Sequence, residues 1–122
     1  MIKERTEIDD VLQTYFDGLY RGDIPALRRA FHPAAMLFGE VKGQPYQKNL
    51  DDYLLIVAQR ESPQALGEPF RMALLSVEVT GLIARAKVHC PMLGYNYIDY
   101  LSMVCHQERW QIVSKTFTHV DV

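Results

Sequence analysis

Long apolar runs and an excess of charge of one sign are both missing from this sequence, and each absence narrows the range of functions. The apolar run Leu54–Ala58 is far too short to span a bilayer, and the charged segment Met1–Glu7 is not typical of a signal peptide. A formal net charge of -2 lacks the basic excess that nucleic-acid-binding proteins carry. We therefore expect a cytoplasmic protein that binds neither nucleic acid nor a membrane.

Clustered metal ligands and recognisable catalytic motifs are also missing. Cys90 and Cys105 are far apart, have no CxxC spacing and lie near no group of histidines. The sequence contains no glycine-rich phosphate loop and no Ser-His-Asp or Cys-His set at a familiar spacing. We expect free buried thiols, no metal site and no cofactor.

Length and composition predict one folded unit. The chain has 122 residues, which is enough to bury a core without disulfides or a structural metal. Hydrophobic residues make up 48% and charged residues 23%, as in ordinary globular proteins. Residues 1–122 are expected to form a single domain.

The first half of the chain has helical periodicity. Apolar residues between Ile8 and Tyr20 recur at the spacing of one continuous helical stripe, and Gly22 ends that helix. Asp23 is well placed to cap a short second helix, and Asn49 to cap a third that Ser62–Pro63 terminates.

The rest of the chain has strand character. A strand is expected at Ala34–Val41, followed by a brief one around Tyr46. Four longer β-rich runs follow, at Phe70–Val79, Leu82–Cys90, Tyr95–Cys105 and Arg109–Val120. The pattern predicts an α+β fold in which helices cover one face of a mainly antiparallel sheet.

The last hairpin places an acid on an apolar face. With Gln107 and Glu108 as the turn residues, strict pairing puts Asp99 opposite Thr116. An ionised carboxylate is costly to bury, so such a group normally pairs, changes its pKa or contacts a ligand. Asp99 is a structural acid on one interpretation and a ligand-binding group on the other.

Small side chains near Asp99 favour a pocket above it. Ala84 and Ala86 in the preceding strand are expected to flank the acid and leave room for a small molecule. The predicted pocket is lined by Tyr15, Phe16, Phe31, Phe38, Ala86, Asp99, Leu101, Met103 and Ile112. The same register places Lys115 opposite Tyr100 on the other face of the sheet.

Two segments resemble a known family. The run Asp99–Phe117 resembles the closing hairpin of the putative lumazine-binding branch of the nuclear transport factor 2-like superfamily, and Gly22–Pro33 resembles that superfamily's junction between helix 2 and strand 1. The resemblance implies a cystatin-like cone, in which three N-terminal helices pack on a strongly curved mixed, mainly antiparallel sheet and enclose a pocket. It also implies a homodimer packed sheet to sheet, for which the expected interface is Ile83, Tyr100, Val104, Val113, Lys115 and Phe117.

The superfamily includes ketosteroid isomerase and polyketide cyclases, whose pockets use carboxylates with a tyrosine or histidine for proton transfer. Asp99 is similar in placement to a strand-borne acid of the isomerase pocket, and Tyr15 is positioned to supply a phenol. A second pocket carboxylate is not found, because the segment 35–39 is apolar.

Three hypotheses therefore stay open. The first is a protein that binds a small apolar or aromatic molecule above Asp99. The second is an isomerase, cyclase or dehydratase that uses Asp99 as acid or base. The third is a non-catalytic module that acts through its outer sheet face.

Overall fold

The computed structural model describes residues 2–121. They contain three helices and six strands, joined by turns and loops. In chain order the elements are α1 (Ile2–Arg21), α2 (Ile24–Ala30), β1 (Phe31–Val41), β2 (Gln44–Asn49), α3 (Leu50–Gln59), β3 (Ala73–Thr80), β4 (Ile83–Met92), β5 (Tyr95–His106) and β6 (Arg109–His119).

The helices begin where their capping residues predict. The side chain of Asp23 accepts a hydrogen bond from the backbone N–H of Ala26, and that of Asn49 accepts one from Asp52. Each bond satisfies an N–H that the first helical turn leaves without a partner. Both predicted N-caps are confirmed.

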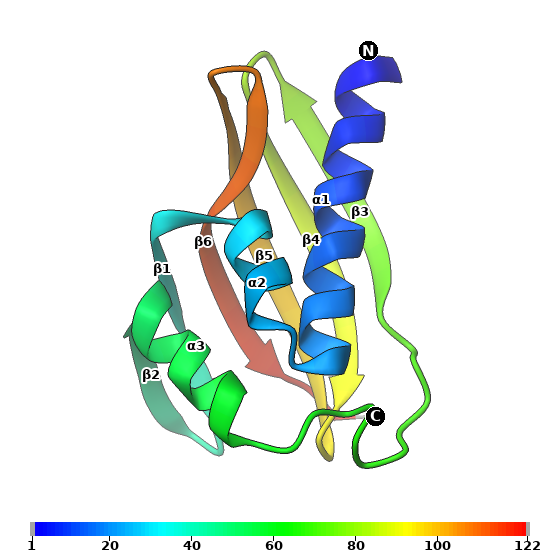
Figure 1. The fold of residues 1–122 in the computed structure, drawn as a ribbon, viewed down its shortest axis with the longest axis vertical. Helices are drawn as coiled ribbons and strands as arrows, with labels where there is room; N and C mark the ends of the chain where they lie inside the picture. The colour runs from blue at the N-terminus through cyan, green and yellow to red at the C-terminus, as the bar shows by residue number, and fades with distance from the viewer. Residues whose placement is uncertain (1, 122) are drawn as a thin grey trace.

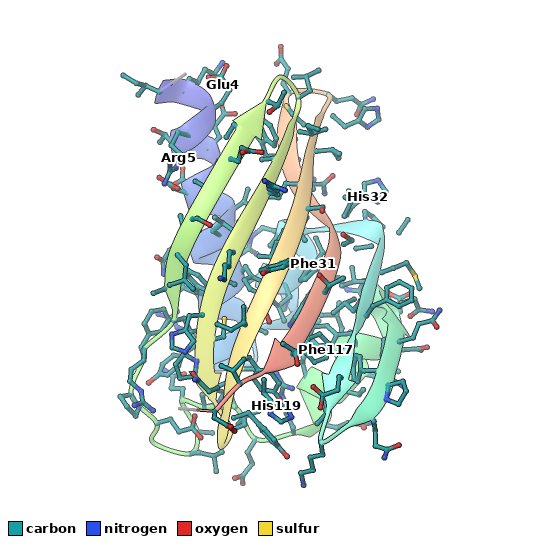
Figure 2. All side chains as sticks on the ribbon, turned by 180° about the vertical axis from the view of Figure 1, so that it is seen from behind. Glu4, Arg5, Phe31, His32, Phe117 and His119 are labelled. Carbon is teal, nitrogen blue, oxygen red and sulfur yellow. The ribbon has the colours of Figure 1, made fainter. Side chains whose placement is uncertain are left out.

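The six strands form one mixed sheet in the order β2-β1-β6-β5-β4-β3. Only β1 and β6 run parallel among these strands, and every other neighbouring pair is antiparallel. All three helices lie on one face of the bent sheet, here called the inner face (Figure 1). The opposite or outer face is seen in Figure 2, where no helix covers the strands. The predicted α+β architecture is confirmed.

Two predicted strands begin three residues away from their expected positions. The chain enters β1 at Phe31, ahead of the predicted Ala34, and Phe31 already has an extended backbone. The third strand begins at Ala73, three residues after the predicted Phe70.

The turn between β5 and β6 is the predicted one. Gln107 and Glu108 both have positive φ, of 53° and 63°. Two such residues form the tight turn whose twist matches that of a two-stranded hairpin. His106 and Arg109 pair on either side of it.

A β-bulge in β6 changes the register beyond this turn. Met103 still pairs with Ile112, but Ser102 pairs with Ser114, so that Val113 is the extra residue. Asp99 consequently lies opposite Phe117, and the predicted pairing with Thr116 is wrong. Because facing direction alternates along a strand, the bulge also exchanges the faces of every residue that follows it.

The core lies between the helices and the inner face. α3 packs on β1 and β2, and α2 contacts β1 and β6. Along β4, Ala84, Ala86 and Val88 are buried while Ile83 is exposed. This alternation identifies the inner face and directs the Asp99 side chain toward the helices.

Gly39 is required where β1 runs beside β6. A β-carbon at this position would lie 2.5 Å from both the backbone oxygen and the ring of Phe117. We predict that Gly39→Ala lowers the free energy of unfolding by about 1–3 kcal/mol, because the two paired strands must separate. Urea denaturation measures the change, and Gln47→Ala on the exposed part of β2 is the control, expected to stay within about 0.5 kcal/mol of the parent. Equal stability of Gly39→Ala and the parent would contradict this close approach.

Candidate functional site

Asp99 on β5 and Lys115 on β6 form a buried ion pair on the inner face. The Lys115 Nζ lies 3.9 Å from the Asp99 Oδ2, and the two residues are only 5% and 1% exposed. The bulge after Ile112 brings them together, since it turns Lys115 inward. The prediction that Lys115 lies on the outer face is therefore wrong.

Aromatic side chains surround the Lys115 ammonium. It donates a hydrogen bond of 3.3 Å to the Tyr53 hydroxyl and lies 4.9 Å from the centre of that ring. The rings of Tyr15 and Phe117 are 5.4 and 5.2 Å away, within the range of cation–π attraction. Burial lowers the pKa of Lys115, but the charge of Asp99, together with Tyr53 and Cys90, more than offsets burial and holds this pKa above its usual value. The side chain is thus an ammonium ion.

Tyr15 holds the Asp99 carboxylate from the helical side. Its hydroxyl donates a hydrogen bond of 2.6 Å to the Asp99 Oδ2, and the Cys90 thiol donates a longer one of 3.6 Å to the same atom. Burial raises the pKa of Tyr15, and the negative charge of Asp99 raises it further. Burial followed by the charge of Asp99 likewise raises the pKa of the Cys90 thiol. Both groups remain protonated donors and are not bases.

A cavity of about 110 Å³ adjoins the ion pair. It lies between α3 and the ends of β1, β2, β4, β5 and β6. We call it the Asp99 cavity, and its lining comprises Val41, Tyr46, Tyr53, Ile56, Arg60, Cys90, Met92, Tyr97, Asp99, Lys115 and Phe117.

The predicted pocket is mostly solid core. Of its nine predicted residues only Asp99 lines the cavity. Tyr15 reaches the site through its hydrogen bond to Asp99. Phe16, Phe31, Ala86, Leu101, Met103 and Ile112 are buried and pack between the helices and the sheet.

Two further placements need correction. Phe38 is 44% exposed and pairs with Thr116 at the outer face, so it does not line the cavity. Val88 lies opposite Asp99, whereas Ala86 and Ala84 pair with Leu101 and Met103, so the two alanines do not flank the acid as expected.

The remaining predicted interface residues divide between the two faces. Ile83 and Tyr100 are both 58% exposed, and Val104 and Val113 are half-buried. Phe117 follows the bulge and lines the Asp99 cavity, where its ring packs against Tyr46 and Tyr97. Its expected place at the outer interface is therefore corrected.

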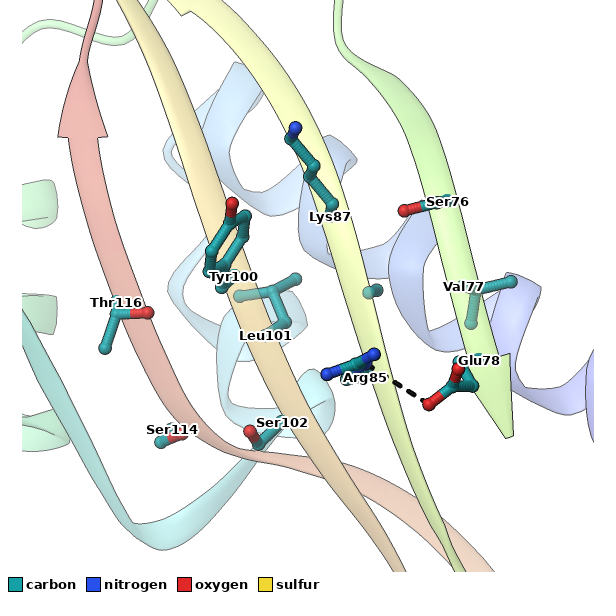
Figure 3. A pocket seen from close by; sticks show the side chains of 11 residues that line it. Ser76, Val77, Glu78, Arg85, Lys87, Tyr100, Leu101, Ser102, Ser114 and Thr116 are labelled. Atoms are coloured by element: carbon teal, nitrogen blue, oxygen red, sulfur yellow. Dashed lines mark ion pairs between the residues drawn. The ribbon is translucent and has the colours of Figure 1, made fainter. Parts of the chain in front are cut away.

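A second, larger hollow of about 610 Å³ lies on the outer face. Figure 3 shows its polar side chains projecting away from the helices, with an ion pair between Arg85 and Glu78. Both charged side chains are mostly exposed, at 77% and 66%. No buried charge lines this hollow, and we place the candidate site at the Asp99 cavity.

Sequence reasoning missed most of the real lining. The predicted pocket did not include Tyr46, Tyr53, Arg60 or Tyr97, which line the cavity. Sequence patterns locate strands and helices but do not show which of their ends lie close together in the fold. One available signal was a change in alternation along β6. The apolar residues Trp110 and Ile112 have even numbers, whereas the apolar residue Phe117 has an odd one. A bulge between Ile112 and Phe117 explains how all three can face inward.

The described residues provide neither a metal site nor a membrane-spanning helix. Within residues 2–121 no group of three histidine, cysteine or acidic side chains is arranged to hold a metal ion. None of the helices described is both long and apolar enough to cross a bilayer.

Comparison with known proteins identifies relatives over nearly the whole chain. A family model described as "Putative lumazine-binding" matches residues 3–118. Aldolase FrzH from Cladobotryum sp. is 28% identical over 118 residues, which cover 92% of this chain and 90% of the relative.

Solved structures agree with this relationship. A nuclear transport factor 2-like protein of unknown function from Silicibacter pomeroyi DSS-3 is 27% identical, with a TM-score of 0.87 and 97% of both chains covered. One from Shewanella baltica OS155 has the same TM-score at 20% identity, covering 99% of this chain and 97% of that one. The second likeness concerns the fold alone.

The ion pair gives a direct prediction for stability. Asp99→Asn and Lys115→Met are each expected to lower the free energy of unfolding by about 3–5 kcal/mol, because each leaves a buried charge without its partner. The double variant is expected to lose less than the sum of the two. Urea denaturation of the four proteins measures the coupling. Additive losses would show that the two charges do not interact.

Proposed function

We propose that this chain, which belongs to the putative lumazine-binding family of nuclear transport factor 2-like proteins, binds a small carbonyl compound in the Asp99 cavity. The observation that carries the proposal is the buried Asp99–Lys115 pair in the wall of that cavity. Buried charges are expensive, and a cavity that joins them to an apolar wall is typical of a ligand site.

Lys115 favours an oxygen-bearing ligand. An ammonium has three N–H donors, and in the described structure Lys115 makes one hydrogen bond, to Tyr53 at 3.3 Å, beside the longer contact with Asp99. A carbonyl oxygen in the cavity would accept a further N–H. The aromatic rings of Tyr46, Tyr97 and Phe117 would enclose its apolar part.

The size of the cavity favours a ligand smaller than the family description suggests. Pockets for drug-sized molecules measure about 300–1,000 Å³, whereas the Asp99 cavity measures about 110 Å³. A fused two-ring molecule such as lumazine would need the surrounding side chains to move. A compound of a few non-hydrogen atoms fits without such movement.

The outer face supports the expected homodimer as part of the proposal. Ile83 and Tyr100 expose large apolar surfaces there, and the hollow between β3 and β6 would receive side chains of a second copy. In this arrangement the Asp99 cavity stays on the inner side of each sheet. A cytoplasmic location likewise stays a prediction.

Binding is tested first on the protein as it is purified from cells. We expect native mass spectrometry to detect a retained small molecule, or carbonyl probes such as acetone, hydroxyacetone and pyruvate to raise the melting temperature. Lys115→Met should abolish the effect, whereas Lys87→Met, an exposed lysine of the outer face, should preserve it. An empty protein that no probe stabilises would contradict the proposal.

A second candidate function is aldol-type chemistry in the same cavity. The similarity to aldolase FrzH over 92% of this chain favours it. Carbon–carbon bond formation of this kind needs a base beside the carbon that loses a proton and a positive group beside the carbonyl oxygen. Asp99 and Lys115 have these two properties and lie 3.9 Å apart.

The proposed steps balance without an added oxidant or cofactor. The Asp99 carboxylate removes a proton from the carbon next to the carbonyl group, and the Lys115 ammonium stabilises the enolate oxygen. The enolate carbon then forms a bond to the carbonyl carbon of a second molecule. The resulting alkoxide takes the proton back from Asp99. Because Lys115 is held as an ammonium, this route is favoured over imine formation by its nitrogen.

The first half of this reaction is measurable without knowing the natural substrate. In D2O the protein is expected to exchange the protons next to the carbonyl group of hydroxyacetone or pyruvate, followed by proton NMR. Asp99→Asn should lose the exchange, with its fold checked by circular dichroism. Asp51→Asn, an exposed acid paired with Arg28, should keep it. No exchange above the rate in buffer with any probe would contradict the aldol candidate.

A further inference from the structure

The charges of the Asp99 cavity do not balance. Three charged residues line it, and two of them, Arg60 and Lys115, are cationic, whereas Asp99 is the only anion in the lining given by the described residues. The Asp99–Lys115 pair accounts for one charge of each sign. One positive charge, that of Arg60, is left without a partner in the lining.

Arg60 is held at the cavity by the end of α3. Its backbone N–H donates to the carbonyl of Ile56, which makes it the C-terminal capping residue of the helix. Burial raises the pKa values of Tyr46 and Tyr97, and the charge of Arg60 acts in the opposite direction on both hydroxyls. The guanidinium is therefore close to the aromatic wall.

The guanidinium is also incompletely bonded. Its Nη2 atom is buried and has no hydrogen-bond partner among residues 2–121. No ion pair joins Arg60 to an acid within the same residues. A cation at a helix C-terminus gains from the helix dipole, but this gain does not require a buried N–H without an acceptor. Buried donors of this kind are normally satisfied.

We infer that the ligand of the Asp99 cavity is a small oxo acid, whose carboxylate binds Arg60 while its carbonyl oxygen lies toward Lys115. The inference rests on the proposed function and adds the substrate class. A carboxylate supplies the missing negative charge and accepts two N–H groups of a guanidinium side by side. With the carbonyl oxygen at Lys115, the neighbouring carbon would lie near Asp99, whose carboxylate is 3.9 Å from the ammonium.

The test compares an acid with a neutral molecule of similar size. Pyruvate is the acidic probe and butan-2-one the neutral one, and binding is measured by NMR titration of the wild-type protein and of Arg60→Gln. Wild type is expected to bind pyruvate more tightly than butan-2-one. Arg60→Gln should weaken pyruvate binding about tenfold or more and leave butan-2-one binding nearly unchanged.

Arg28→Gln is the matched control, because Arg28 is a surface arginine that pairs with Asp51, and neither residue lines the cavity. It should bind both probes as wild type does. Circular dichroism checks that both variants fold.

The results distinguish a failure of the oxo-acid assignment from a failure of the proposed carbonyl site. Equal binding of pyruvate and butan-2-one, or an unchanged pyruvate affinity in Arg60→Gln, overturns the oxo-acid assignment and leaves the carbonyl site standing. Failure of wild type to bind either probe overturns both. Loss of both probes in Arg60→Gln also overturns the assignment, since Arg60 would then support the cavity and not the carboxylate.

Discussion

The candidate site depends on one ion pair, the contact between Asp99 and Lys115 beneath the helices. Each charge would be costly at its position without the other, and the Tyr15 and Tyr53 hydroxyls each add a hydrogen bond to the pair. The pair also joins two strands, β5 and β6, to the helices α1 and α3, from which the two tyrosines come. Four elements therefore meet at one polar point within an otherwise apolar core.

A β-bulge makes this arrangement possible. Without the extra residue Val113, Lys115 would face outward and Asp99 would be buried without a cationic partner. Bulges re-aim side chains in this way and are common beside functional sites. The bulge also brings Phe117 inward, so the cation and one of the rings around it arrive together. The local irregularity in β6 thus supplies two parts of the cavity wall.

The same bulge marks the limit of what could be predicted from the sequence. Helices and their caps followed from periodicity and from Asp23 and Asn49, because these signals are local. The buried position of Asp99 followed from the hairpin register near its turn. The faces of Lys115 and Phe117 did not, because strict alternation was assumed across a position that has neither glycine nor proline to mark an interruption. Arg60 lies outside such reasoning, since its place depends on where α3 ends relative to the sheet.

Stability and function are connected by the cost of burying these charges. Replacing a buried ion pair by apolar residues of similar volume is often neutral or stabilising, so burial of Asp99 and Lys115 is poorly explained by stability alone. The cost is also concentrated beside a cavity that has charges of both signs in its lining. Arg60 adds a second cation at the same place, with a buried N–H that no described residue accepts. Asp99, Lys115 and Arg60 all line one cavity of about 110 Å³. A single bound anion explains these three charged groups more simply than three separate structural roles would.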